Sequence, residues 1–202
     1  MSMQKAQWRH GILLVALAGC TLLAACGDGK PSFKNTDLTG ASYGRDFQLT
    51  DHTGRPRTLA DFRGKVVTLF FGFTRCPDVC PTTLAEMRDV LGKLGEDAKR
   101  VQVIFVTVDP ERDTEALLAK YITAFDPSFI GLRGDAAQTA AVAKEFKVFF
   151  EKRAGTTPDS YTIDHTAGTY VIDPHGRLRL FVRHAQNPDP LVSDLKLILA
   201  GK

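Results

Sequence analysis

The sequence predicts an α/β fold in which a mixed central β-sheet is flanked by helices. Two continuous apolar runs, residues 66–71 and 101–108, have the length and composition of buried central strands. Apolar residues at helical spacing follow each run, at residues 82–94 and 114–125. Strands that alternate with helices are typical of a sheet whose faces are covered by helices.

Turn residues and helix caps place the other elements. A small hairpin around a Gly turn is predicted at residues 47–59. Thr82 or Thr83 can cap the first helix, and Asp135 can cap an Ala-rich helix that continues to about Phe146. The chain also contains a short strand at 129–132, a polar loop or extended hairpin at 151–163, a hairpin at 168–182 and a helix at 191–199. The predicted order is therefore β-α-β-α-β-α-β-β-α.

The apolar stripes of the helices assign side chains to the core. Met87 falls on the stripe of the first helix, so we expect it in the core rather than at a metal. One side of the second helix is formed by Leu117, Leu118, Tyr121 and Phe125.

The composition indicates one globular domain and excludes a nucleic-acid-binding protein. The chain has 202 residues, of which 44% are hydrophobic and 24% are charged. Its net charge of +3 includes Lys5 and Arg9 near the N-terminus, and the chain from residue 26 onward is nearly neutral. A nucleic-acid partner would require Lys and Arg clustered on one face, and no such cluster is present in the sequence.

Residues 1–25 are predicted to be a signal peptide of the lipoprotein type or a membrane anchor. Lys5 and Arg9 precede an apolar run at residues 12–25, which is shorter than the roughly 20 residues that span a bilayer. The run ends in Leu-Ala-Ala-Cys-Gly, which resembles a bacterial lipoprotein processing box. In that interpretation Cys26 is diacylated and becomes the first residue of the mature protein.

Two alternatives remain open at the N-terminus. The sequence that ends at Cys20 also fits the processing box, but it would leave the apolar residues 21–25 on the mature protein. An uncleaved anchor helix is the other alternative. In each case we expect a membrane-anchored domain that faces the periplasm or extracytoplasmic side of a bacterial membrane. Residues 26–44, which are polar and aperiodic, are expected to be a linker to a domain at 45–202.

Cys76 and Cys80 are the cysteines that remain for the folded domain, since the other two lie in the targeting segment. A domain with two cysteines is not a disulfide scaffold, because such scaffolds are small and rich in cysteine. The pair lies where a buried strand ends and a helix begins, and a helix N-terminus stabilises thiolates. Positions i and i+4 share a helix face, so both sulfurs can point to the same side. Pro81 also suits a first helical turn.

Two thiolates on one face favour a soft metal ion, above all Cu(I), and leave room for a third ligand. His165 is the candidate, since it follows the polar segment 151–163 and precedes a strand. Asp164 can orient this histidine as a hydrogen-bond acceptor, although neighbouring side chains on a strand point to opposite faces. The histidines expected at the surface are His52, His175 and His184.

Four segments together resemble the Sco/SenC family of copper chaperones. They are Phe-Thr-Arg-Cys-Pro-Asp-Val-Cys-Pro at 73–81, Val-Thr-Val-Asp-Pro at 106–110, Asp-His-Thr at 164–166 and Tyr-Val-Ile-Asp-Pro-His-Gly at 170–176. The resemblance extends over about residues 45–200. It implies a thioredoxin-like fold, and it maps Cys76, Cys80 and His165 onto the copper ligands of the family. Asp109, Pro110 and Asp164 map onto motif positions. The lipoprotein-like start differs from the single transmembrane helix of many members.

The function that the resemblance implies is that of a metallochaperone without turnover of a small substrate. It would bind Cu(I), Cu(II) or both, and deliver copper to the binuclear copper centre of cytochrome c oxidase during assembly. The implied partners are the copper-site subunit of the oxidase, other periplasmic copper chaperones and the membrane.

The alternative is a thiol–disulfide oxidoreductase in which Cys76 and Cys80 form the redox-active pair and reduce the oxidase cysteines. Thioredoxin-like enzymes use Cys-x-x-Cys and a cis-Pro opposite it, whereas this chain has three intervening residues and no Pro at 163–166. These differences favour copper. A peroxidase is disfavoured, because Thr74 lies two residues before Cys76 rather than three.

Overall fold

The protein was analysed as a computed structural model that describes residues 32–157, 160–184 and 187–202. Residues 32–202 form one compact unit. The acylation candidates Cys20 and Cys26 lie outside the described residues. Within the described part of the chain, no helix is long and apolar enough to cross a membrane.

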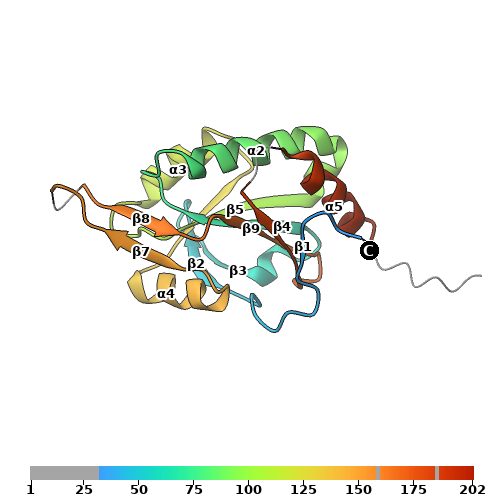
Figure 1. Ribbon diagram of the computed structural model, residues 1–202, viewed down its shortest axis with the longest axis horizontal. Helices are drawn as coiled ribbons and strands as arrows, with labels where there is room; N and C mark the ends of the chain where they lie inside the picture. The colour runs from blue at the N-terminus through green and yellow to red at the C-terminus, as the bar shows by residue number, and fades with distance from the viewer. Residues whose placement is uncertain (1–31, 158–159, 185–186) are drawn as a thin grey trace, which may run out of the picture. The chain divides into compact units, whose positions relative to one another are not determined.

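An eight-stranded mixed sheet forms the centre of the domain (Figure 1). The strand order is β1-β10-β9-β4-β5-β6-β2-β3. Parallel pairing joins β4 to β5 and β5 to β6, and the other neighbours pair antiparallel. The strands are β1 (Thr36–Asp37), β2 (Gln48–Asp51), β3 (Pro56–Thr58), β4 (Val66–Gly72), β5 (Val101–Thr107), β6 (Ile130–Arg133), β9 (Gly168–Ile172) and β10 (Leu178–Arg183).

The two apolar runs of the sequence form the central strands, as predicted. Every residue of β4 and β5 is buried, and the two strands pair in parallel from Val66 opposite Val101 to Gly72 opposite Thr107. A strand covered on both faces needs apolar side chains on both, which explains why the runs are continuous rather than alternating.

Helices cover both faces of the sheet (Figure 1). One face carries α2, α3 and α5, and the other carries α4. The predicted cap of α4 is confirmed, because Asp135 forms a capping box with Gln138. Helix α3 is capped by Thr114, whose side chain accepts from the amide of Leu117. The predicted mixed sheet flanked by helices is thus confirmed. The helices are α2 (Val79–Leu94), α3 (Glu115–Thr123), α4 (Ala136–Glu145) and α5 (Asp189–Leu199), with short 3₁₀ helices at Leu59–Phe62 and Gly95–Arg100.

Two details of the helices differ from the prediction. Helix α2 begins at Val79 with Asp78 as its N-cap, four residues before Thr82, the first of the two predicted caps. The apolar stripe of α3 is formed by Leu118 and Ile122, which are fully buried, whereas Leu117 is 36% exposed. Met87 lies in the core, as predicted.

Residues 32–44 differ from the linker that their composition indicates. They belong to the compact unit, and β1 pairs with β10 at the edge of the sheet. The buried carboxylate of Asp194 in α5 accepts hydrogen bonds from the amides of Lys34 and Asn35 and from the Asn35 side chain. A two-residue strand has no periodicity, so these distant contacts determine its position.

A separate two-stranded sheet pairs β7 (Phe150–Arg153) with β8 (Thr162–His165). It forms the extended hairpin that was one of the two predictions for this segment. Figure 1 shows that the hairpin projects from the end of the domain where α2 begins. His165 is the last residue of β8 and lies opposite Phe150.

Candidate metal centre

The structure brings together the three residues that the sequence predicts as metal ligands. The ligand atoms of Cys76, Cys80 and His165 all lie within 4.8 Å of one another. The Cys80 Sγ is 3.5 Å from the His165 Nε2, and the Cys80 amide donates to the Cys76 Sγ at 3.4 Å. Bonds of a tetrahedral metal to sulfur and nitrogen are about 2.0–2.3 Å long. The largest distance between the three ligand atoms is therefore close to the diameter of the coordination sphere of one metal ion.

The two cysteines lie at the junction between β4 and α2, but they do not share a helical turn as predicted. Cys80 is in the first turn of α2 and is fully buried. Cys76 precedes the helix, in a turn closed by the hydrogen bond from its amide to the Phe73 carbonyl at 3.2 Å. The turn places the Cys76 sulfur at the N-terminus of α2, so both sulfurs still lie close together.

Gly72, the last residue of β4, provides the space for the Cys80 sulfur. A Cβ atom at this position would lie 2.7 Å from the Cys80 Sγ and 2.8 Å from the ring of Phe105. A larger residue would therefore displace the thiol or the ring, which makes glycine a requirement of close packing here. The sequence analysis did not identify Gly72, although a glycine that ends an apolar strand is a recognisable signal.

His165 lies next to the Cys80 thiol although it follows Cys80 by 85 residues in the sequence. Its ring contacts the rings of Phe70 and Phe73 edge-on, with centroids 6.0 Å apart in both pairs. The Nδ1 atom lies 3.2 Å from the carbonyl oxygen of Thr166. A carbonyl only accepts, so this bond places the proton of a neutral ring on Nδ1 and leaves Nε2 free to bind a metal.

The orienting role considered for Asp164 is wrong. Its carboxylate points away from the imidazole and accepts a hydrogen bond from Arg153 at 2.7 Å. Side chains alternate along β8, so Asp164 and His165 lie on opposite faces of the hairpin. The Thr166 carbonyl, rather than the Asp164 carboxylate, is the hydrogen-bond acceptor for the imidazole.

The two thiols differ in protonation. The pKa of Cys76 is lowered to about 4, chiefly because the Cys80 thiol donates a hydrogen bond to its sulfur; the contact with His165 and the amides of Asp78 and Cys80 add to this. The pKa of Cys80 is raised, because its proton is held by the Cys76 thiolate and because the side chain is buried. The helix N-terminus therefore helps to stabilise the thiolate, but its main partner is the second thiol.

A buried carboxylate holds the loop that carries Cys76. Asp113 is fully buried and accepts hydrogen bonds from the amide and hydroxyl of Thr74, at 3.1 and 2.6 Å, and from the hydroxyl of Thr107. Burial raises the pKa of Asp113 in spite of these bonds. The sequence analysis did not identify this residue, because its partners come from two other segments.

The other three histidines of the described residues do not join the site. His175 is exposed, as predicted. His52 and His184 are half-buried instead: the His52 Nδ1 accepts from the amide of Gly131 at 3.1 Å, and the His184 Nδ1 lies 3.1 Å from the Thr83 hydroxyl. Both rings therefore have structural partners.

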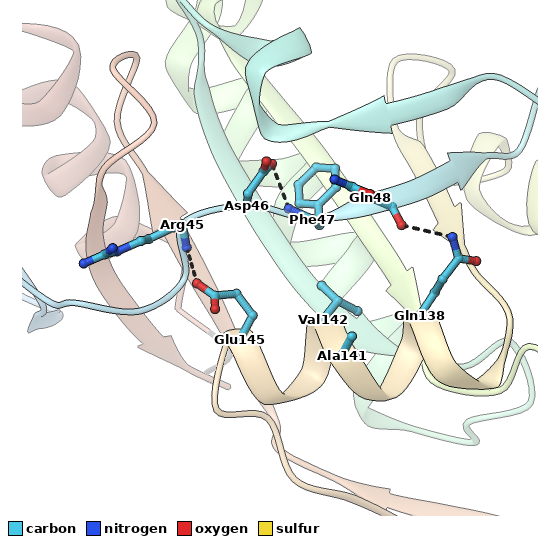
Figure 2. A pocket seen from close by; sticks show the side chains of 8 residues that line it. All are labelled: Arg45, Asp46, Phe47, Gln48, Gln138, Ala141, Val142 and Glu145. Atoms are coloured by element: carbon cyan, nitrogen blue, oxygen red, sulfur yellow. Dashed lines mark hydrogen bonds between the residues drawn. The ribbon is translucent and has the colours of Figure 1, made fainter.

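A cavity of about 330 Å³ opens at the Cys76 thiol and the imidazole, and its walls include Cys76, Val79 and His165. Another cavity, of about 440 Å³, lies between residues 45–48 and helix α4 (Figure 2). Its lining consists of Phe47, Val142 and Ala141 with polar residues around them and includes no thiol or imidazole. The first cavity is the one suited to a soft metal.

Comparisons with known proteins agree with the geometry. The family model described as SCO1/SenC matches residues 35–200. The mitochondrial SCO2 homolog of Bos taurus is 35% identical over 203 aligned positions, which cover 96% of this chain and 76% of that protein. The structure of Bradyrhizobium japonicum ScoI with copper bound has a TM-score of 0.72 at 43% identity and covers 78% of this chain and 100% of that one.

A further solved structure is that of BsSco, described as a member of the Sco family of cytochrome c oxidase assembly proteins in which a disulfide switch was identified. It has a TM-score of 0.63 at 25% identity and covers 86% of this chain and 99% of that one. These similarities and the sheet order confirm the thioredoxin-like fold that the resemblance implies.

The asymmetry of the two thiols predicts the pH dependence of alkylation. The rate at which iodoacetamide modifies Cys76 should stay nearly constant from about pH 8 to about pH 5, since the thiolate is the nucleophile. It should then fall with a midpoint near the pKa of about 4. Peptide mass spectrometry after timed alkylation measures the rate. In a Cys80→Ala control the midpoint should move upward, because the hydrogen-bond donor is lost. A midpoint near about 8.5 in the unmodified chain would contradict the thiolate assignment.

Proposed function

Because the chain belongs to the SCO1/SenC family, we propose that it is a copper-binding metallochaperone. It delivers copper to the binuclear copper centre of cytochrome c oxidase during assembly of the enzyme. The observation that carries this proposal is the cluster of Cys76, Cys80 and His165 donor atoms within 4.8 Å. The copper in Bradyrhizobium japonicum ScoI and the description of BsSco as an oxidase assembly protein support it.

The donor set suits copper in both oxidation states. Two thiolates hold Cu(I), which prefers soft ligands, and an imidazole adds a donor that Cu(II) favours. Cys76 is already a thiolate when the site is empty, whereas Cys80 must lose its proton when the metal binds. Copper binding therefore releases a proton and becomes stronger as the pH rises.

The exposure of the ligands supports transfer rather than permanent storage. Cys80 is fully buried, whereas Cys76 and His165 are half-buried and line the open cavity of about 330 Å³. An acceptor can approach copper from this side and replace the accessible ligands one at a time. Val79 and Pro77 line the same cavity and offer apolar contact to that acceptor.

A second candidate function is thiol–disulfide exchange with the cysteines of the oxidase copper site. The low pKa of Cys76 favours it, and so does the disulfide switch identified in BsSco. In this reaction Cys76 and Cys80 become a disulfide and give two electrons to a partner disulfide. The partner becomes two thiols by taking up the proton of Cys80 and one proton from solvent, since Cys76 is already a thiolate.

Two structural features favour copper over this alternative. The described residues contain no cis peptide bond, so the cis-Pro expected of a thioredoxin-like reductase is not found among them. An imidazole lies 3.5 Å from the buried thiol instead.

The attachment to the membrane follows from the N-terminal sequence. We propose that Cys26 is diacylated and that the domain faces the periplasm of a bacterial cell, where an oxidase copper centre and other copper chaperones are accessible. Cys26→Ser should then leave an unprocessed precursor, because the thioether forms on that sulfur. Mass spectrometry of the mature N-terminus measures this. Acylation at Cys20, or an intact first residue in the unmodified protein, would contradict the assignment.

Copper stoichiometry tests the ligand set in residues 32–202, where Cys76 and Cys80 are the cysteines present. The reduced domain should retain one copper ion per chain after gel filtration, and the disulfide form should retain none. Metal analysis of both forms gives the ratio. The same copper content in the two forms would rule out the thiols as ligands.

His165→Ala separates the two candidate functions. Two thiolates can still hold Cu(I) in near-linear geometry, whereas Cu(II) loses its only imidazole. We expect Cu(II) affinity to fall by about 100-fold or more, because groups that only hydrogen-bond to a metal ligand already contribute about 10–100-fold to metal affinity. The dithiol should still oxidise and be reduced, but the variant should fail to support oxidase assembly at limiting copper.

The measurement is oxidase activity in a deletion strain that expresses the variant. Cys76→Ala and Cys80→Ala serve as matched controls, because both candidate functions require the thiols. Full rescue by His165→Ala, together with no rescue by either cysteine variant, would establish the redox function instead.

A further inference from the structure

The position of His165 depends on how the β7–β8 hairpin is held against the domain. This hairpin is a sheet of its own and shares no strand pairing with the main sheet. Its strands connect to the centre of the domain through the buried side chain of Ile163, the His165–Cys80 contact and a group of polar contacts at the start of β8.

Those polar contacts converge on the turn at residues 109–112, which follows β5. The hydroxyl of Tyr161 donates to the Asp109 carboxylate at 2.6 Å, and the Arg112 guanidinium donates to the Tyr161 carbonyl at 2.8 Å. The same guanidinium lies 3.5 Å from the centroid of the Tyr161 ring. One residue of the hairpin, four positions before His165, is therefore held through its main chain, its ring and its hydroxyl.

The groups of this contact are preorganised by burial. The Asp109 carboxylate is completely buried and forms an ion pair with Arg112, whose side chain is 11% exposed. Burial and the hydrogen bond to Asp109 raise the pKa of Tyr161 to about 12, so the phenol keeps the proton that it donates. A charged hydrogen bond shielded from water is stronger and more directional than an exposed one.

The same turn is connected to the loop that carries Cys76. The Asp109 amide donates to the hydroxyl of Thr107, and that hydroxyl donates to Asp113. Asp113 in turn accepts both hydrogen bonds from Thr74, two residues before Cys76. Arg112 also lies over the ring of Phe73, at 6.0 Å. The loop that carries Cys76 and the hairpin that carries His165 are thus both connected to the turn at residues 109–112.

We propose that Asp109, Arg112 and Tyr161 are positioning residues that set the distance between the imidazole and the two thiols. They thereby determine how strongly the site prefers Cu(II). This inference rests on the proposed copper site and adds to it the groups that assemble its two halves. Without the Tyr161 contact the hairpin is held less tightly, and the imidazole occupies its binding position for a smaller fraction of the time. The two thiols are carried by α2 and the loop before it rather than by the hairpin, so Cu(I) binding is largely retained.

Tyr161→Phe tests the proposal, because it removes the hydroxyl and keeps the ring over Arg112. The full chain is used in detergent, with Cys20→Ser and Cys26→Ser in every protein so that no other thiol competes. The probes are Cu(I) and Cu(II) alone, measured by competition with chelators, together with the thiolate-to-Cu(II) absorption band. Glu151→Ala is the matched control, since it removes only an exposed ion pair with Arg153 inside the same hairpin and leaves the Tyr161 contacts in place.

Tyr161→Phe should lower Cu(II) affinity about tenfold, the lower end of the effect of removing groups that orient a metal ligand. Cu(I) affinity should change by less than about twofold, and Tyr161→Ala should lower Cu(II) affinity further. In the copper-free protein, the amides of β8 should exchange with deuterium faster in Tyr161→Phe than in Glu151→Ala.

Unchanged Cu(II) affinity in Tyr161→Phe, with a large loss in a parallel His165→Ala protein, would overturn the positioning role and leave the copper site intact. Equal losses of Cu(I) and Cu(II) affinity, together with a lower melting temperature, would show a structural role instead. If His165→Ala itself keeps its Cu(II) affinity, the ligand assignment fails, and this inference fails with it.

Discussion

The contact of 3.5 Å between the buried Cys80 thiol and the His165 imidazole is the constraint on which the site depends. The two residues come from different elements, a helix that follows the central strand and a hairpin outside the main sheet. Gly72 leaves room for the sulfur, the Thr166 carbonyl orients the ring, and the turn at 109–112 holds both supporting segments. The fold therefore acts as a scaffold that keeps three donors together before any metal is present.

The pairing of one thiolate with one buried thiol links copper binding to redox chemistry. Both processes remove the proton of Cys80 and use the same sulfur electron pairs, so a disulfide cannot hold copper through these thiolates. Under the proposed function, the oxidation state of the pair would decide whether copper can load, and a partner that reduces the disulfide would prepare the site for metal. Copper transfer would then use the reduced form of this dithiol, and thiol–disulfide exchange would convert it to the oxidised form. The imidazole is the feature that distinguishes a metal site from a simple redox pair.

Local signals in the sequence predicted most of the elements. The continuous runs predicted β4 and β5, and the Asp135 cap predicted the start of α4, because burial and capping depend on residues close together in the sequence. Strand β1 and the residues beside it were missed, since Asp194 at the other end of the chain holds them. The three donor residues followed from residue chemistry and family resemblance. The roles of Gly72, Asp113 and Tyr161 could not be predicted in this way, because they arise from contacts between distant segments. The prediction for Asp164 was wrong because the pairing of β8 determines which face of the hairpin its side chain occupies.

The central claim is that copper is bound by both thiols and by the imidazole in one site. X-ray absorption at the copper edge, recorded on the reduced domain loaded with one equivalent of copper, tests it most directly. The account predicts scattering from two sulfurs and one imidazole nitrogen for Cu(II), and loss of the imidazole signal alone in His165→Ala. A spectrum with a single sulfur, or one with no imidazole contribution in the unmodified domain, would contradict it.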